Sequence, residues 1–353
     1  MRSIYDLTYS QMEEWCLSKG WKKFRTQQIF RWLYKERVID FDEMTNLSKE
    51  TREELKKDFM FNPLALVTKQ VASDGTTKFL FKTKDGALME SVMMVFDYGN
   101  SICVSSQVGC NMGCTFCASG LTKKQRDLTP GEMLGQVMHV QHELDKKNER
   151  LSHIVVMGTG EPFDNYDAVM NFLLTANHDR GLAIGSRHIT ISTSGIVPKI
   201  KQFADGHYQY NLAVSLHAPN DELRTKLMPV NKAYPLAELM DAVEYYTKEN
   251  NRRLTFEYIL IKGVNDSLEH AKQLANLLRP YICYVNLIPY NSVDENGYQS
   301  TTRQEAMKFY DALKKQGIAV TIRKEHGSDI DAACGQLRIK ELRKEKRLKE
   351  EHQ

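Results

Sequence analysis

The sequence of 353 residues lacks any run of about 18 apolar residues, the length that a membrane-spanning helix requires. Its N-terminus also lacks the basic start and apolar segment of a secretion signal. Proline is scarce, with nine residues, while 42% of residues are hydrophobic and 26% charged, as in globular rather than disordered or fibrous proteins. We therefore expect a cytoplasmic protein without a membrane partner.

Cysteine is also scarce, and an odd count of seven without an export signal indicates free or metal-bound thiols instead of a disulfide scaffold. The formal net charge is only +3, so overall charge indicates no partner. Positive charge is concentrated at residues 19–37, where Lys and Arg alternate with aromatic side chains and can lie along RNA phosphates. The apolar members of this stretch have helical spacing and are expected to pack as core: Phe24, Ile29, Phe30 and Leu33.

Patterns along the chain divide it into four segments. In order, these are a small N-terminal helical domain at 1–75, a β-hairpin linker at 76–100, a barrel at 101–335 and a charged tail at 336–353, expected to be a frayed helix. Gly20 is a plausible helix stop in the first segment, and Asp85-Gly86 suits the positive φ angles of a hairpin turn.

From residue 101 onward, short β-rich runs alternate with helical stretches. The expected strands lie near 101–106, 152–157, 188–193, 211–216, 254–261, 283–288 and 318–323. Between the first two, Thr129, Pro130 and Glu132 form a helix start with an N-cap and a capping box. This alternation predicts an α/β fold of parallel strands with right-handed crossovers, either an open sheet or a full or partial barrel.

The faces of these strands favour the barrel. In the run at 188–193, Ile189 and Ile191 oppose Thr190 and Ser192, and the other runs likewise have one polar face. An open parallel sheet covered by helices on both sides is apolar on both faces. We therefore expect helices outside and a polar ligand cavity inside.

The segment "GCNMGCTFCASG" places Cys110, Cys114 and Cys117 directly after the first expected barrel strand, at the mouth where barrel active sites form. Three thiolates leave one coordination position of a metal centre open for chemistry. A structural zinc site with Cys103 as the fourth ligand is the alternative, although a separation of seven residues is unusual for zinc.

The Cys-x3-Cys-x2-Cys run with an aromatic residue before its last cysteine resembles the motif of the radical S-adenosylmethionine (SAM) superfamily. Further segments, including "SSQVGC", "GTGEPFDN", "ISTSGIVP", "LMPVN", "GVND" and "DIDAACGQLR", resemble the RlmN/Cfr family of RNA adenine methyltransferases across nearly the whole chain. The resemblance implies a partial (β/α)6-type radical SAM barrel. It also implies one [4Fe-4S] cluster per chain, held by Cys110, Cys114 and Cys117, and SAM as the second cofactor.

The resemblance implies methylation of C2 of an adenosine in 23S rRNA and of the adenosine 3′ of the anticodon in tRNAs. C2 lies between two ring nitrogens and is too electron-poor to attack a methyl cation donor, so a radical must form the bond. By resemblance, Cys334 is first methylated, its methylene radical adds to the base, and a Cys103–Cys334 disulfide releases the product while Glu90 removes the C2 proton.

The apolar neighbours of Glu90 on its strand are consistent with a partly desolvated base, and a solvent-facing edge-strand glutamate is the alternative. The SAM contacts that the resemblance implies lie at or near the ends of the expected barrel strands. They are Gly160, Glu161, Ser192, Ser215, Leu216, His217 and Asn291.

The expected partners are 23S rRNA, tRNA and an electron donor such as a flavodoxin system, and the chain is expected to act as a monomer. Two other functions remain open from the sequence. One is Cfr-type methylation of C8 of the same rRNA base, against which the proline of "GEP" argues. The other is a non-catalytic, zinc-stabilised RNA-binding protein.

Overall fold

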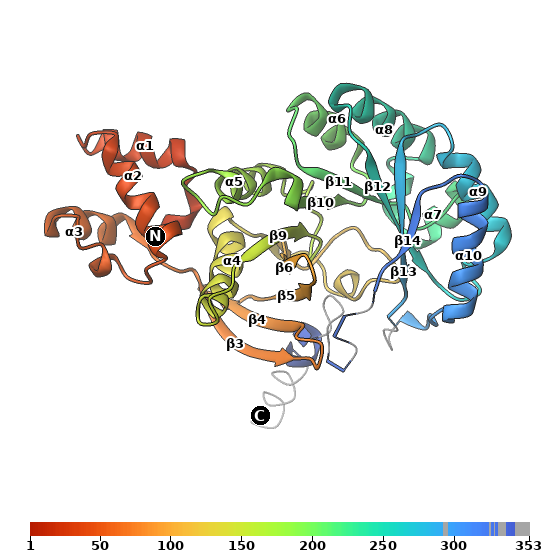
Figure 1. The fold of residues 1–353 in the computed structure, drawn as a ribbon, viewed down its shortest axis with the longest axis horizontal. Helices are drawn as coiled ribbons and strands as arrows, with labels where there is room; N and C mark the ends of the chain where they lie inside the picture. The colour runs from red at the N-terminus through yellow and green to blue at the C-terminus, as the bar shows by residue number, and fades with distance from the viewer. Residues whose placement is uncertain (292–295, 325, 328, 331–336, 343–353) are drawn as a thin grey trace.

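A computed structural model describes residues 1–291, 296–324, 326–327, 329–330 and 337–342. It is an α/β protein in which one long, curved sheet carries helices on its outer face, while a separate group of helices lies beside it at the N-terminus (Figure 1). Within the described residues, no helix is long and apolar enough to cross a membrane.

The N-terminal domain is built from α1 (Tyr9–Ser18), α2 (Phe24–Arg31) and α3 (Lys49–Asp58). Ile29, Phe30 and Leu33 are fully buried, as their spacing predicts. The expectation for Phe24 is wrong, because this first residue of α2 is 49% exposed and lies against the guanidinium group of Arg25.

Four antiparallel strands follow this domain. The structure confirms the hairpin, in which β4 (Thr77–Thr83) and β5 (Leu88–Phe96) flank a turn where Gly86 has a φ of 85°. The hairpin continues into β6 (Gly99–Cys103) on one side and into β3 (Leu64–Val71) on the other. The sequence did not predict β3, which has a bulge at Leu66–Thr68 and a largely exposed surface.

Parallel strands extend the sheet from β6 onward in chain order. They are β9 (Leu151–Val156), β10 (Ile189–Thr193), β11 (Asn211–Ser215), β12 (Leu254–Leu260), β13 (Cys283–Pro289) and β14 (Val320–Ile322). All were expected from the sequence. In the described residues β14 and β3 are the two edges, so the sheet is a partial barrel, as predicted.

Helices cross between these strands on the outer face. They are α4 (Pro130–Asp145), α5 (Tyr166–Asn177), α6 (Val197–Asp205), α7 (Asp221–Leu227), α8 (Leu236–Asn250), α9 (Leu268–Leu278) and α10 (Arg303–Lys315). The predicted start of α4 is confirmed, because Thr129 and Glu132 form a capping box with Pro130 at the first helical position.

The two faces of the barrel strands differ as predicted. Ile189, Ile191 and Val214 point outward and are fully buried beneath the helices. Thr190 and Ser192 face the inside of the barrel and are only partly buried. The alternation therefore leaves a polar interior that contains cavities.

Candidate active site

The three motif cysteines lie in a loop whose two ends are held together. β7 (Gln107–Val108) pairs with β8 (Arg126–Asp127) in antiparallel fashion on either side of the loop. Within it, the backbone N–H of Cys110 donates a hydrogen bond of 3.1 Å to the carbonyl of Thr122. Gly109 has a φ of 81°, and a Cβ there would lie 2.2 Å from the carbonyl oxygen of Lys123. The close approach of these backbones therefore requires glycine.

A cavity of about 260 Å³ separates this loop from the C-terminal ends of the barrel strands. The structure brings to this cavity most of the residues selected from the sequence: Cys110, Cys114, Cys117, Gly160, Glu161, Ser192, Ser215 and His217. Two of the implied SAM contacts do not line it. The side chain of Leu216 is buried in the apolar core, and Asn291 is exposed immediately beyond β13.

Glu161 is held by backbone N–H groups inside the cavity wall. Its carboxylate accepts hydrogen bonds from the N–H of Ser194 at 2.7 Å and of Phe163 at 3.0 Å. Burial raises the pKa of this carboxyl group, while the bonds from Ser194 and its neighbours oppose the rise. Gly160, with a φ of 117°, allows this close packing, because a Cβ there would lie 2.7 Å from the Cβ of Gln107.

His217 has a fixed orientation at the end of β11. Its Nδ1 accepts a hydrogen bond of 3.0 Å from the N–H of Ile259, so a neutral ring carries its proton on Nε2. Burial, and then the charge of Arg224, lower the pKa of His217 to about 3. The edge of Phe116, the aromatic residue of the cysteine motif, packs against this ring. The neutral imidazole thus links the loop to the strand ends.

Sequence reasoning missed Arg224, a fully buried cation on α7. Its guanidinium group donates hydrogen bonds to the carbonyl of Ser194 at 2.6 Å and of Leu216 at 3.3 Å, and to Oδ1 of Asn231 at 2.9 Å. Burial lowers its pKa to about 10, and the nearby Cys114 opposes this change. Arg224 therefore fixes the strand ends around the cavity and provides a positive charge beside the cysteine loop. Only "LMPVN", which contains Asn231, signalled this region in the sequence.

The three cysteines fit an iron–sulfur cluster. Burial raises the pKa of Cys110 to about 11 and that of Cys114 further, so each thiol must lose a proton when it binds a cluster as a thiolate. Among the described residues, no three His, Cys, Asp or Glu side chains lie close enough together to hold a single metal ion. A [4Fe-4S] cluster binds each thiolate through a different iron, and three thiolates leave the fourth iron open. Glu161 and His217 line the same cavity on the strand side.

Cys103, at the end of β6, lies beside this cavity on the inner face of the sheet. It packs with Val92 and Met94 of β5 and with Met157. Met157 also lines the cavity, and Arg323, from the opposite wall, approaches the sulfur of Met94 at 3.8 Å. Met157 thus belongs both to the cavity lining and to the group of side chains around Cys103.

Glu90 lies on the same face of β5, two residues before Val92, and is buried. Its Oε2 lies 3.0 Å from Nζ of Lys78, and its Oε1 accepts a hydrogen bond from the backbone N–H of Arg338. The alternative of a solvent-facing edge-strand glutamate is wrong, because β4 and β6 flank β5 and the helical residues 337–342 cover this face.

Cys334 lies outside the described residues, so its pairing with Cys103 stays a prediction. No disulfide bond joins two of the six cysteines that the structure describes. The tail also differs from expectation where it is described, since Leu337 is buried against Leu80 and Leu88 of the hairpin.

Two family models match the chain. Residues 104–277 match the radical SAM superfamily, and residues 3–60 match the N-terminal domain of ribosomal RNA large subunit methyltransferases. A crystal structure of a radical SAM methyltransferase from Sphaerobacter thermophilus superposes with a TM-score of 0.92 at 43% identity, covering 95% of this chain and 99% of that one.

Curated relatives agree with the family models. Proteins named probable dual-specificity RNA methyltransferase RlmN are 57% identical in Listeria welshimeri, 58% in Enterococcus faecalis and 59% in Geobacillus kaustophilus. These alignments cover 97–98% of this chain and 94–98% of the relatives. The radical SAM superfamily is defined by a [4Fe-4S] cluster and SAM, which are this chain's cofactors. With its motif loop, partial barrel and N-terminal domain, the chain belongs to the RlmN family of radical SAM RNA methyltransferases.

Proposed function

We propose that the chain methylates C2 of adenosine in both ribosomal and transfer RNA, at the 23S rRNA base and the base 3′ of the anticodon that the sequence resemblance implies. One observation carries the proposal. Cys103 and Glu90 lie on a single inner face of the β5–β6 pair, next to the cavity that contains the three motif cysteines. A binding protein with a structural metal has no use for a thiol and a buried carboxylate in this place.

The cofactors supply what the side chains lack, namely the methyl group and the radical chemistry that forms a bond to an electron-poor carbon. Cys110, Cys114 and Cys117 hold the cluster in this proposal, and Glu161 and His217 position SAM across the strand ends. Glu161 is suited to an amino group because its oxygens are already oriented by two N–H groups.

The side chains of the protein then take part in bond formation, bond cleavage and one proton transfer. Cys334 carries the methyl group, whose carbon loses one hydrogen atom to the radical chemistry and becomes bonded to C2, so that one CH2 group joins the sulfur to the RNA. Glu90 accepts the C2 proton, and the neighbouring Lys78 stabilises its carboxylate until then. The thiolate of Cys103 attacks the sulfur of Cys334 and a disulfide forms. The carbon–sulfur bond to the RNA breaks, and its carbon keeps the electron pair and takes up a proton, which leaves a methyl group on C2.

The same proposal includes the compartment, the oligomeric state, the electron donor and the RNA-contacting domain. The chain acts as a cytoplasmic monomer and receives electrons from a donor such as a flavodoxin. The N-terminal domain contacts RNA through its cationic stretch, where Lys22 and Lys35 are exposed.

Mass spectrometry of nucleosides tests the proposal. An unmodified 23S rRNA fragment and an unmodified tRNA are incubated anaerobically with the reconstituted protein, SAM and a reductant. We expect 2-methyladenosine from both RNAs. 8-Methyladenosine from the rRNA fragment would instead identify the Cfr-type reaction, and no product from protein with an intact cluster would contradict methylation.

The Cys103→Ala variant tests the release step. We expect it to stop after a single event as a covalent protein–RNA adduct, visible as a shifted band on a denaturing gel. Cys283→Ala is the matched control, since Cys283 is also buried in a barrel strand but packs in the outer core. Free methylated RNA from Cys103→Ala at the control's yield would contradict the role of Cys103.

A further inference from the structure

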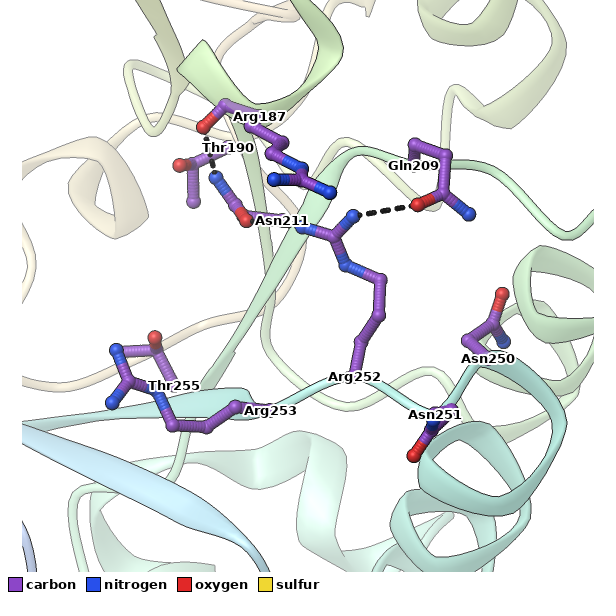
Figure 2. Close-up of a pocket in the computed structure, with 9 residues that line it drawn as sticks. All are labelled: Arg187, Thr190, Gln209, Asn211, Asn250, Asn251, Arg252, Arg253 and Thr255. Atoms are coloured by element: carbon purple, nitrogen blue, oxygen red, sulfur yellow. Dashed lines mark hydrogen bonds between the residues drawn. The ribbon is translucent and has the colours of Figure 1, made fainter.

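A second cavity, which we call the basal arginine cavity, lies at the opposite end of the barrel from the cysteine loop. It measures about 600 Å³ and is formed by the N-terminal ends of β10, β11 and β12 and the segments that precede them (Figure 2). The same strands line both cavities. Thr190 and Thr255 face the basal one, whereas Ser192 and Glu257, two residues further along, face the candidate active site.

The basal arginine cavity is strongly positive. Arg187, Arg252 and Arg253 line it, and no Asp or Glu does. In the described part of the chain, the arginines that form ion pairs are others: Arg31, Arg37 and Arg126. Like charges that line one cavity repel each other, so an anion bound there is stabilised.

Two of the three guanidinium groups, those of Arg252 and Arg253, have neutral partners. Arg252 donates to Oε1 of Gln209 at 3.0 Å and to Oδ1 of Asn211 at 2.8 Å, and Asn211 in turn donates to the carbonyl of Arg187 at 2.7 Å. Figure 2 shows the side chains of Arg187 and Arg252 extending into the same space. Arg253 is held 4.9 Å from the ring centre of Tyr284. These contacts orient Arg252 and Arg253 without compensating their charge.

The chemistry of the lining selects the ligand. All nine lining residues are polar, being three arginines, four amides and two threonines. A pocket for a free nucleotide or another small molecule is mostly apolar, and here a base has no side chain to stack on. Arginine, amide and hydroxyl groups are those that contact phosphate and sugar oxygens without reading sequence. We propose that the basal arginine cavity binds the phosphate backbone of the RNA substrate.

This assignment rests on the proposed function for the presence of RNA, and the dimensions allow it. The seven residues of β12 span roughly 23 Å at about 3.3 Å per residue, which approximates the separation of the two barrel ends. A folded RNA that inserts one base at the mouth extends well beyond this distance. Phosphate binding in the basal arginine cavity would therefore hold the RNA in place, while the candidate active site at the other end of the barrel selects the base.

Salt-dependent RNA binding tests the proposal with the full-length, cluster-containing protein. The variant Arg187→Gln/Arg252→Gln/Arg253→Gln removes the three charges but keeps polar side chains. A second variant, Arg187→Gln/Arg253→Gln, retains the hydrogen bonds of Arg252 in case the first is poorly folded. The matched control removes three charges from exposed positions on α6, α9 and α10: Lys201→Gln/Lys272→Gln/Lys308→Gln.

We expect the triple arginine variant to bind a long rRNA fragment at least about tenfold more weakly at low salt, and the double variant to show an intermediate loss. Between about 50 and 200 mM salt, the slope of log K against log salt should fall by about 2 in the triple variant. Both arginine variants matching the lysine control would overturn the proposal.

A short stem–loop carrying the target adenosine separates this proposal from the proposed function. It is too small to reach the basal arginine cavity, so wild type and arginine variants should methylate it at equal rates. Methylation of the stem–loop together with unchanged long-RNA binding by the variants would overturn only the basal site. Micromolar pyrophosphate binding that the triple variant loses while its RNA binding stays at wild-type strength would overturn the assignment to RNA.

Discussion

At the scale of single residues, backbone conformation determines the cavity as much as side-chain chemistry does. Gly160 and His217 both have positive φ angles, which place the Glu161 turn and the imidazole against the cysteine loop. The sequence motifs identified both positions as functional. They could not reveal Arg224, because a single arginine in a short charged helix is typical of a solvent-facing position, and its burial depends on tertiary packing.

Gly160→Ala tests the backbone requirement. The new Cβ would lie 2.7 Å from Cβ of Gln107, whose side chain accepts the N–H of Glu161. We expect a loss of about 1–3 kcal/mol in unfolding free energy and at least a tenfold weaker SAM affinity, measured by chemical denaturation and equilibrium binding. Gly185→Ala is the control, since no atom lies within 4 Å of its Cβ position. Unchanged SAM binding by Gly160→Ala would contradict the prediction.

His217 should make stability depend on pH. Its pKa is about 3 when folded and about 6.5 when unfolded, so between these values only the unfolded chain binds the proton. Stability is therefore constant above about pH 6.5 on this account and falls as pH drops below it, by up to about 1.4 kcal/mol per pH unit. His217→Asn, which tolerates positive φ and can still accept the N–H of Ile259, should remove this component.

Urea denaturation of both proteins between about pH 5 and pH 7 measures the difference. Subtracting the pH profile of His217→Asn from that of the wild type removes the contribution of other histidines whose pKa burial also lowers, such as His139. Parallel pH profiles for wild type and His217→Asn would show that His217 is protonated as readily in the folded protein as in the unfolded chain.

At the scale of elements, the hairpin is an active part of the barrel. The sequence predicted β4 and β5 from their alternation, but it could not show that β3 extends the hairpin beside β4 or that residues 337–342 cover one of its faces. β3 itself was missed because its pattern is broken by a bulge and both its faces are partly exposed. Glu90 on β5 is therefore buried only because β4, β6 and residues 337–342 meet around it.

Substitutions in the Lys78–Glu90 pair should show the effect of this burial on the unfolding free energy. Lys78→Met removes the cation of a buried ion pair and should cost about 3–5 kcal/mol of unfolding free energy. The double variant Lys78→Met/Glu90→Leu should recover most of that loss. Lys69→Met breaks a partly exposed pair with Glu143 and should cost less than about 1 kcal/mol. Equal losses for Lys78→Met and Lys69→Met in chemical denaturation would contradict the prediction.

At the scale of the whole molecule, the N-terminal domain and the barrel share one apolar core. Polar contacts join them as well, because Arg37 forms a two-bonded pair with Asp145 of α4 and Asp6 accepts the N–H of Gly131. The alternation of strands and helices was sufficient to predict the barrel. The contacts between the domains join residues that are far apart in the sequence. They therefore produce no periodic pattern from which they could be predicted.

We expect the full chain to unfold in one calorimetric transition, because no boundary separates two cores. Arg37→Met should lower the unfolding free energy by about 1–2 kcal/mol, since Asp145 loses a partner in a half-buried position. Arg31→Met, which breaks an exposed pair with Glu36, should have little effect. Two resolved transitions in the wild-type protein would show that the domains are independent.

The order of strands in the sheet has a consequence for how the chain is made. From β3 to β14, every strand of the large sheet lies beside its predecessor in the chain. The antiparallel strands β3–β6 have mostly local pairings and can form as they leave the ribosome, presenting β6 as an edge for β9. Each later strand then adds to the edge left by the last. No strand has to insert between two that are already paired, so an unfinished chain exposes only one growing edge at any stage of its synthesis.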